Sequence, residues 1–171
     1  LNESRLLKKY SQQLTDKCLY ACISGEDTDF LNKEYHLHNV KHLAAFPAWQ
    51  TVTGEEGMGN LCLYHGNLSV AENEEAAIWL LQNVFNKIRK PFVIAGKNPS
   101  KRLQKMAHVY QHTCLVANPT DGELNDLIRK AHINLLPSFN KNTTGIKLKL
   151  LHVLFEGRHC VVSEPMVKGT G

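Results

Sequence analysis

The stretch LCLYHGNLSVAENEEAAIWLLQNVF, residues 61–85, decides the fold. It opens with an apolar run, residues 61–65, whose length suits a buried strand. A polar turn follows, in which Ser69 and Glu72 have the spacing of a capping box, so we expect a helix to begin there. Pro91 is predicted to end this helix. Apolar side chains repeat at helical spacing and predict one buried face, made of Ala77, Leu80, Leu81, Val84, Phe85 and Ile88.

The same succession of strand and helix recurs along the rest of the chain. Further strands are predicted over residues 92–95, 113–117, 133–136 and 160–163. We expect the intervening helices to begin at Asn98 and Pro99, at a capping box formed by Thr120 and Glu123, and at Gly145. The apolar faces of the second and third helices are Leu103, Met106, Ala107 and Tyr110, and Leu124, Leu127, Ile128 and Ala131. This alternation predicts an α/β fold, a Rossmann-like doubly wound parallel sheet.

Residues 1–46 are predicted to form a helix, a strand, a second helix and a second strand, in that order. Leu7, Tyr10 and Leu14 repeat at helical spacing, and residues 18–23 form an apolar run of strand length. Ser24 is predicted to cap a helix over residues 27–35, and residues 40–46 are predicted to form the second strand. Residues 47–60 contain Pro and Gly without a hydrophobic period and are interpreted as a linker. A separate C-terminal domain, cut short, is therefore expected over residues 61–171.

The composition is that of a globular protein, with 43% hydrophobic and 21% charged residues. A net charge of +4 does not by itself indicate nucleic-acid binding; it suits a phosphate-bearing ligand or an anionic membrane surface, and equally an unremarkable surface. No apolar run reaches the ~18 residues of a membrane span, and no secretory signal is visible. The chain starts at Leu1 without a Met and stops at Gly171, so we expect a piece of a larger protein.

The five cysteines are odd in number and scattered, which argues against a disulfide framework. All of them fall in apolar runs, so we interpret them as small buried hydrophobes of a cytosolic protein. Zinc-site spacing is absent among them. A metal cluster is suggested at first sight by three histidines, His36, His38 and His42. Because they lie in a loop-like stretch, we expect them to hold no metal.

In a doubly wound sheet, ligands bind beyond the carboxyl ends of the strands, where the strand order reverses. If the order is 3-2-1-4-5, the exit loops at the reversal are residues 65–69 and 137–144. The second loop leads into a helix predicted over residues 145–156, and the N-terminus of a helix offers N–H groups to a phosphate. Lys149 and His152 lie one turn apart on the single polar stripe of that helix. Lys149 is a candidate for a diphosphate and His152 for a ribose hydroxyl or a proton, although the stripe also fits a merely solvated edge.

Two other loops carry candidates. Lys97 follows the second strand and could reach a phosphate, and Asn118 follows the third strand and could contact a base. Both loops also fit plain turns. The chain lacks a G-x-G-x-x-G fingerprint and a phosphate-binding loop ending in Gly-Lys-Ser/Thr. These absences count against a nicotinamide dehydrogenase and a P-loop NTPase.

Four ordered motifs carry a family resemblance. They are YHGNLS (64–69) followed by Asn73, FVIAGK (92–97), AHINLLPS (131–138), and TGIKLKLL (144–151) followed by Gly157 and VVS (161–163). In this order they resemble the C-terminal, donor-binding domain of GT-B glycosyltransferases, especially glycosyltransferase family 4. Residues 1–46 are similar to the end of the N-terminal, acceptor-side α/β domain of such an enzyme.

The resemblance implies a donor site in the cleft between the two domains. It implies that Gly66 and Asn67 face the donor phosphates, that Lys149 approaches the diphosphate and that position 152 approaches the ribose. Together with the candidates from the loops, the predicted donor-binding residues are Gly66, Asn67, Lys97, Asn118, Ser138, Thr144, Gly145, Lys149 and His152. The catalytic residues are not identified.

The chain departs from the family pattern at two places. Many members carry two glutamates separated by seven residues; here His152 stands in place of the second, and the first falls near Thr144. Many members also carry an Arg and a Lys after the first strand, where this chain has Asn67 and Asn73. The departures bear on activity and on donor identity more than on the fold.

We therefore expect a cytoplasmic glycosyltransferase of polysaccharide biosynthesis. It would move a sugar from a nucleoside-diphosphate sugar to a glycan or lipid-linked acceptor, with no cofactor, no metal and no nucleic-acid partner. Peripheral contact with a membrane fits the mildly basic charge. This chain alone should bind donor weakly and transfer nothing. The alternatives are a GT-B-fold sugar-nucleotide epimerase and a non-catalytic module that keeps the fold for protein contacts.

Overall fold

The computed structural model describes residues 2–52, 54, 56–140, 146–156 and 158–167. The chain divides into two compact units. The first is built mainly from Leu1–Ala48, and the second from Trp49–Asn142 and Lys147–Val167.

The first unit contains a two-stranded parallel sheet and two helices. Its elements are α1 (Asn2–Ser11), β1 (Tyr20–Cys22), α2 (Gly25–Tyr35) and β2 (Val40–His42). The Ser24 hydroxyl accepts a hydrogen bond from the Asp27 N–H at 3.4 Å, which confirms the predicted cap of α2. Two expectations are wrong: β2 stops at His42 instead of residue 46, and α1 stops before Leu14, leaving Leu7 and Tyr10 exposed.

The second unit is built around a five-stranded sheet in which every pair of neighbouring strands is parallel. Along the chain its elements are β3 (Leu61–Asn67), α3 (Ala71–Asn83), β4 (Phe92–Lys97), α4 (Lys101–Val109), β5 (Thr113–Ala117), α5 (Asp121–Lys130), β6 (Ala131–Leu136), α6 (Leu148–Phe155), β7 (His159–Val162) and α7 (Glu164–Val167). The strand order is β5-β4-β3-β6-β7. Counted within this unit it is 3-2-1-4-5, so the α/β doubly wound prediction is confirmed.

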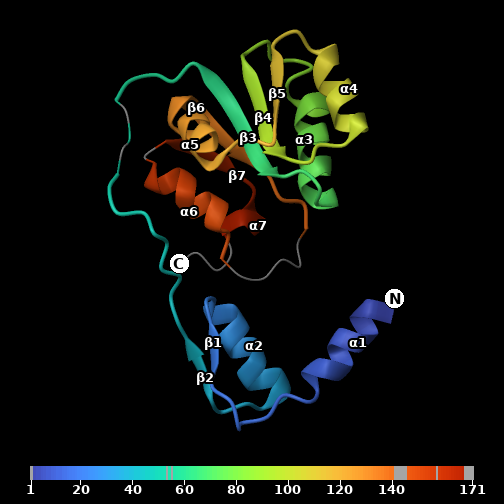
Figure 1. Ribbon diagram of the computed structural model, residues 1–171, viewed down its shortest axis with the longest axis vertical. Helices are drawn as coiled ribbons and strands as arrows, with labels where there is room; N and C mark the ends of the chain where they lie inside the picture. The colour runs from blue at the N-terminus through green and yellow to red at the C-terminus, as the bar shows by residue number, and fades with distance from the viewer. Residues whose placement is uncertain (1, 53, 55, 141–145, 157, 168–171) are drawn as a thin grey trace. The chain divides into compact units, whose positions relative to one another are not determined.

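Helices cover both faces of this sheet, with α3 and α4 on one face and α5 and α6 on the other (Figure 1). The alternation of side chains along β3 divides the core accordingly: Tyr64 packs with α3, and Leu63 packs with α5 and α6. Under α3, the rings of Phe85 and Phe92 stack with centroids 3.8 Å apart. Burying one such side chain stabilises the fold by about 1.5–3 kcal/mol. The two apolar layers therefore fix β3 from both sides.

The predicted helix starts have mixed outcomes. Thr120 and Glu123 form the expected capping box of α5. The capping box of Ser69 and Glu72 is wrong, because α3 begins after Val70 without a side-chain cap and the Ser69 hydroxyl donates to Asn67 Oδ1 instead. Asn98 is not the cap of α4 either.

Ser100 caps α4, because its hydroxyl accepts from the Leu103 N–H at 3.2 Å. Asn98 instead adopts a left-handed conformation with φ 51° and turns the chain at the end of β4. Asn is one of the few residues that tolerate this region. The sequence Asn-Pro marks a turn here, and the helix starts two residues beyond the proline, at Lys101.

Two helix lengths also differ from the expectation. α3 ends at Asn83 rather than near Pro91, since Phe85 turns into the core to stack on Phe92, and Ile88 is left 48% exposed. α6 begins at Leu148 rather than at Gly145, because Ile146 and Lys147 are not helical. Thr144, Gly145 and Gly157 lie outside the described residues.

The expectation that the cysteines are buried is confirmed only in part. Cys18 and Cys114 are exposed, whereas Cys22, Cys62 and Cys160 are partly buried. Cys114 lies on β5, an edge strand of the sheet, and belongs to neither of the two apolar layers. Burial raises the pKa of Cys160 to about 11 and also raises the pKa of Cys62, where the charge of Lys90 opposes the shift.

These environments predict unequal thiol reactivity. At pH 8 we expect iodoacetamide to modify Cys18 and Cys114 at least about tenfold faster than Cys160, because the thiolate is the nucleophile and burial suppresses it. Mass spectrometry of labelled peptides over a time course measures the rates. Equal rates for Cys114 and Cys160 would contradict the burial described for β7.

The close pairing of β3 and β4 requires a glycine at position 96. A Cβ there would overlap the carbonyl oxygen of Gly66 on the neighbouring strand and would lie 2.8 Å from Leu68 Cγ. We predict that Gly96→Ala lowers the melting temperature by several degrees, since overpacking costs about 1–3 kcal/mol. Gly122→Ala, in α5, is the matched control because nothing lies within 4 Å of its added Cβ. A thermal melt in which both variants behave alike would refute this requirement.

Candidate functional site

The candidate site lies at the carboxyl ends of β3 and β6, the two neighbouring strands where the order of the sheet reverses. The loops that leave these strands go to opposite faces, one to α3 and the other toward α6. Diverging loops leave an opening between them, and this is where α/β sheets bind ligands. The N-terminal turns of α3 and α6 bring the side chains described below to this end of the sheet.

Lys149 reaches from α6 to the end of β3. Its ammonium lies 3.4 Å from Asn73 Oδ1 and 5.8 Å from the centre of the Tyr64 ring. The other atom of the Asn73 amide, Nδ2, donates to the carbonyl of Asn67 at 3.0 Å, and the Tyr64 hydroxyl donates to the Asn73 carbonyl at 2.8 Å. Asn73 therefore joins β3, α3 and the cation of α6 in one network.

A carboxylate accompanies this cation. Glu72, in the first turn of α3, accepts a hydrogen bond at 2.8 Å from the hydroxyl of Ser138, which follows β6. The Ser138 N–H in turn donates to the Ser163 hydroxyl at 2.8 Å, and that hydroxyl donates back to the Ser138 carbonyl. Ser138 is buried, so these bonds fix the loop after β6 to the end of β7. Glu72 and Ser138 thereby connect the two loops that flank the reversal.

The electrostatics of Lys149 reflect partial burial beside a carboxylate. Burial lowers the pKa of Lys149, the charge of Glu72 opposes this shift, and the ammonium of Lys147 adds to it. Burial also raises the pKa of Tyr64, with a further contribution from Glu72, so the phenol stays a neutral donor. Taking a cation partly out of water makes a later contact with an anion stronger, because the dielectric screening is weaker there.

His65 lies beside this network on β3 and is 4% exposed. Its Nε2 has no hydrogen-bond partner among the residues that the structure describes. Burial lowers its pKa to about 4, and the charges of Lys149 and His152 contribute to the same shift. The imidazole is therefore neutral near pH 7 and holds an unused polar atom.

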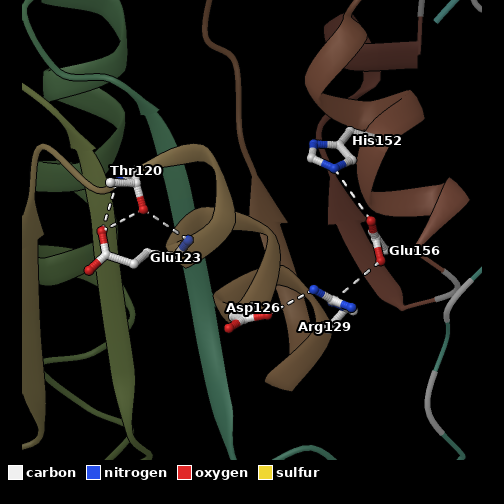
Figure 2. A network of polar contacts seen from close by, with 6 residues as sticks. All are labelled: Thr120, Glu123, Asp126, Arg129, His152 and Glu156. Carbon is white, nitrogen blue, oxygen red and sulfur yellow. Dashed lines mark hydrogen bonds and ion pairs between the residues drawn. The ribbon is translucent and has the colours of Figure 1, made fainter. Parts of the chain in front are cut away.

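His152 points toward Glu156, as Figure 2 shows. Its Nε2 lies 3.6 Å from Glu156 Oε1, and Glu156 Oε2 lies 3.9 Å from Nε of Arg129 on α5. Arg129 also pairs with Asp126 at 2.8 Å. This chain of polar contacts ties α6 to α5, and it occupies the edge of the His152 ring.

The face of the His152 ring is covered as well. Trp49 stacks on it with ring centroids 4.9 Å apart and planes at 13°, and the same indole stacks on Phe155 at 5.5 Å. The His152 side chain is consequently only 16% exposed. Such a stack holds the start of the segment that precedes β3 against α6.

A hollow of about 320 Å³ lies at the carboxyl ends of β3 and β4. Its lining includes His65, Gly66, Asn67 and Lys97 from the strands, and Asp121 from the start of α5. Asn118, in a left-handed conformation with φ 53°, accepts a hydrogen bond from the Asn98 N–H at 2.8 Å and braces the two loops beside the hollow. Its amide oxygen is thus engaged within the protein.

The structure brings the predicted residues together only in part. Gly66, Asn67 and Lys97 line one hollow, while Ser138 and Lys149 meet through Glu72 and Asn73 beside it. His152 and Asn118 have partners within the protein, and Thr144 and Gly145 lie outside the described residues.

The sequence analysis missed Glu72, His65 and Trp49 as members of the site. Glu72 had been assigned to a helix cap, and Trp49 was a single aromatic residue within a stretch interpreted as a linker. His65 is part of the exit loop that the sequence did identify. Its place in a run predicted to be a buried strand indicates its burial, but its charged neighbours Lys149 and His152 lie far from it in sequence.

Two features that bear on other functions are absent from the described part of the chain. No group of three or more His, Cys, Asp or Glu side chains there is placed to hold a metal ion. Among the helices that the structure describes, none combines the length and the apolar character that a membrane crossing requires.

Comparison with known proteins places the fold. No protein-family model matches the sequence, and no curated protein matches it either. Among solved structures, a point mutant of TarM from S. aureus, crystallised with fondaparinux, α-GlcNAc-glycerol and UDP, aligns with 91% of this chain at a TM-score of 0.71 and 12% identity. Another TarM structure aligns at 0.70 and 14% identity over 91% of the chain, and a GtfA/B complex at 0.61 and 12% over 85%.

The alignment covers only 32%, 31% and 30% of those chains, so this chain spans about a third of their length. At such low sequence identity the likeness is one of fold. The five-stranded unit has the Rossmann-like architecture of GT-B glycosyltransferase domains.

The buried His65 predicts a loss of stability in acid. Its pKa is about 4 in the folded protein and about 6.5 when unfolded, so below pH 6.5 the unfolded chain binds more protons. The contribution is complete above pH 6.5 and is lost as the pH falls toward 4. Between pH 7 and pH 5 this one group should remove about 2 kcal/mol from the free energy of unfolding.

Urea unfolding at the two pH values measures this loss. Between pH 7 and pH 5, the free energy of unfolding of His65→Gln should fall by about 2 kcal/mol less than that of the wild type, because Gln does not take up a proton. His108→Gln, at an exposed position on α4, is the control and should follow the wild type. Parallel losses in the wild type and His65→Gln would show that His65 is not held neutral by burial.

Proposed function

We propose that this chain is the donor-binding part of a glycosyltransferase similar to family 4 and that it binds a nucleoside-diphosphate sugar. The observation that carries the proposal is the position of Lys149. Its partly buried ammonium is held by Asn73 at the carboxyl end of β3, where a doubly wound sheet binds ligands. A diphosphate is the anionic group of such donors, and a fixed cation at this position suits it.

The role proposed for the two lysines follows from the charge that develops during glycosyl transfer. In transfer, the bond between the anomeric carbon and the diphosphate oxygen breaks, a bond to an acceptor hydroxyl oxygen forms, and the acceptor proton is lost. Lys149 would stabilise the negative charge that develops on the departing diphosphate. Lys97, in the hollow lined by Gly66 and Asn67, supplies a second cation for the nucleotide. No cofactor or metal enters this scheme.

The fold likeness supports the same assignment, because TarM was crystallised with UDP and a sugar-bearing glycerol. By this analogy the acceptor would be a glycan or a lipid-linked glycan, and residues 1–46 would belong to the acceptor side. We propose a cytoplasmic role in polysaccharide biosynthesis.

One observation favours a different function, a non-catalytic module for protein contacts. His152, which occupies the position that would approach the ribose, is covered by Trp49 and paired with Glu156. Such a ring contacts a ribose only after Trp49 moves. If the chain is such a non-catalytic module, it retains the fold while its donor site is closed.

Nucleotide binding distinguishes the two functions. We expect uridine, guanosine or adenosine diphosphate to raise the melting temperature of the 171-residue chain. A nucleotide at ten times its Kd adds about 1.4 kcal/mol. For a chain of this size that is a shift of roughly 3–6 °C.

Lys149→Met should abolish the shift. Lys105→Met, which removes an exposed lysine from α4, should retain it and controls for the change in net charge. The absence of a shift with all three nucleotides in folded wild-type protein would favour the non-catalytic module. A shift that survives Lys149→Met would remove Lys149 from the site.

A further inference from the structure

His65 has a polar atom that the proposed donor chemistry does not use. The side chain is more than nine-tenths buried, yet its Nε2 has no partner within the described part of the chain. A buried polar atom without a partner costs about 1–3 kcal/mol, so such atoms in native structures call for an explanation. The same residue lines the hollow at the ends of β3 and β4. A ligand in that hollow could supply the missing partner.

The charges around His65 indicate which kind of ligand this is. From α6, Lys149 and His152 act on the imidazole, and both oppose its protonation. Lys97 from β4 and Asp121 from α5 line the same hollow. The named neighbours thus comprise two lysines, a second histidine and one carboxylate. An anionic ligand placed among them would reverse the balance and favour a proton on His65.

We propose that binding of a nucleoside diphosphate at this site is coupled to the uptake of a proton by His65, whose Nε2–H then donates a hydrogen bond to a phosphate oxygen. The proposal rests on the donor-binding function inferred above. It adds a ligand contact on β3 and a pH dependence to that function. The proton comes from solvent and returns to it when the nucleotide leaves, so no covalent bond to the ligand forms or breaks.

The coupling has a defined sign. If the complex restores His65 to an ordinary pKa of about 6.5, binding at pH 6.5 takes up ~0.5 proton at this residue. The free protein holds almost none there at that pH, because its His65 is neutral. By linkage, nucleotide affinity then rises as the pH falls, by about fourfold between pH 8 and pH 6. The ionisation of the nucleotide itself changes over the same range but is common to all variants.

Calorimetric titration of the 171-residue chain with uridine, adenosine and guanosine diphosphates tests the coupling. Titrations at pH 6.5 in buffers of different ionisation enthalpy give the number of protons taken up per nucleotide bound. We expect His65→Gln to take up ~0.5 proton fewer than the wild type and to lose the fourfold pH dependence. His108→Gln, at an exposed position on α4 that does not line the hollow, should behave like the wild type.

A second measurement needs no variant. The protein has nine histidines, and His65 should stay neutral at pH 5.5 because of its burial. NMR spectra of 15N-histidine-labelled protein show a neutral histidine by the signals of its imidazole nitrogens. Saturating nucleotide should convert this signal to that of an imidazolium. The measurement covers the case in which His65→Gln does not fold.

The outcomes separate the two proposals. If nucleotide binds and the wild type and His65→Gln take up equal numbers of protons, or the neutral signal persists in the complex, the coupling is refuted while donor binding stands. If His152→Gln removes the uptake instead, the proton goes to His152 and the assignment to His65 is wrong. If no nucleotide gives heat or a melting shift, donor binding fails and the coupling fails with it.

Discussion

Everything at the candidate site depends on β3 being hydrogen-bonded along both edges. Pairing with β4 and β6 places this strand in the middle of the sheet, and the apolar layers under α3 and under α5 and α6 hold its two faces. A strand constrained in this way has little freedom at its end. The polar groups at its carboxyl end are therefore positioned by the core, and the loops around them need only diverge. This arrangement requires glycine at position 96, because the backbone of β3 at Gly66 occupies the space that a side chain there would need.

The two charged side chains at the reversal of the sheet, Lys149 and Glu72, each have a defined partner. Lys149 is held by Asn73 and faces Glu72, and Glu72 is held by Ser138. These contacts keep the ammonium of Lys149 at a fixed position. His65 remains neutral beside it because burial and the nearby cations act in the same direction. The result is a site whose charge can respond to a ligand, whereas a cluster of exposed lysines would respond mainly to salt.

The sequence predicted the sheet well because buried parallel strands are apolar runs bounded by turn residues. All five runs, and the order of the strands, agree with the structure. Predictions failed where neighbouring turn residues compete: Ser69, Asn98 and Ser100 all favour caps, and only packing decides which of them starts a helix. At the site, Lys149 and Gly66 could be proposed from position in the fold. The contact of Lys149 with Asn73 and the cover of His152 by Trp49 could not, because they join residues far apart in sequence through the packing of α6.

The paired turns after β4 and β5 have a consequence for the chemical ageing of the protein. Asn98 and Asn118 both adopt left-handed conformations, and asparagine in such turns is often followed by glycine, a sequence prone to deamidation. Deamidation requires the nitrogen of the following residue to attack the side-chain amide. Here proline follows both asparagines, and its substituted nitrogen carries no proton and blocks this attack. The chain thus obtains the turn geometry while avoiding the slow appearance of new negative charges beside a hollow proposed to receive an anion.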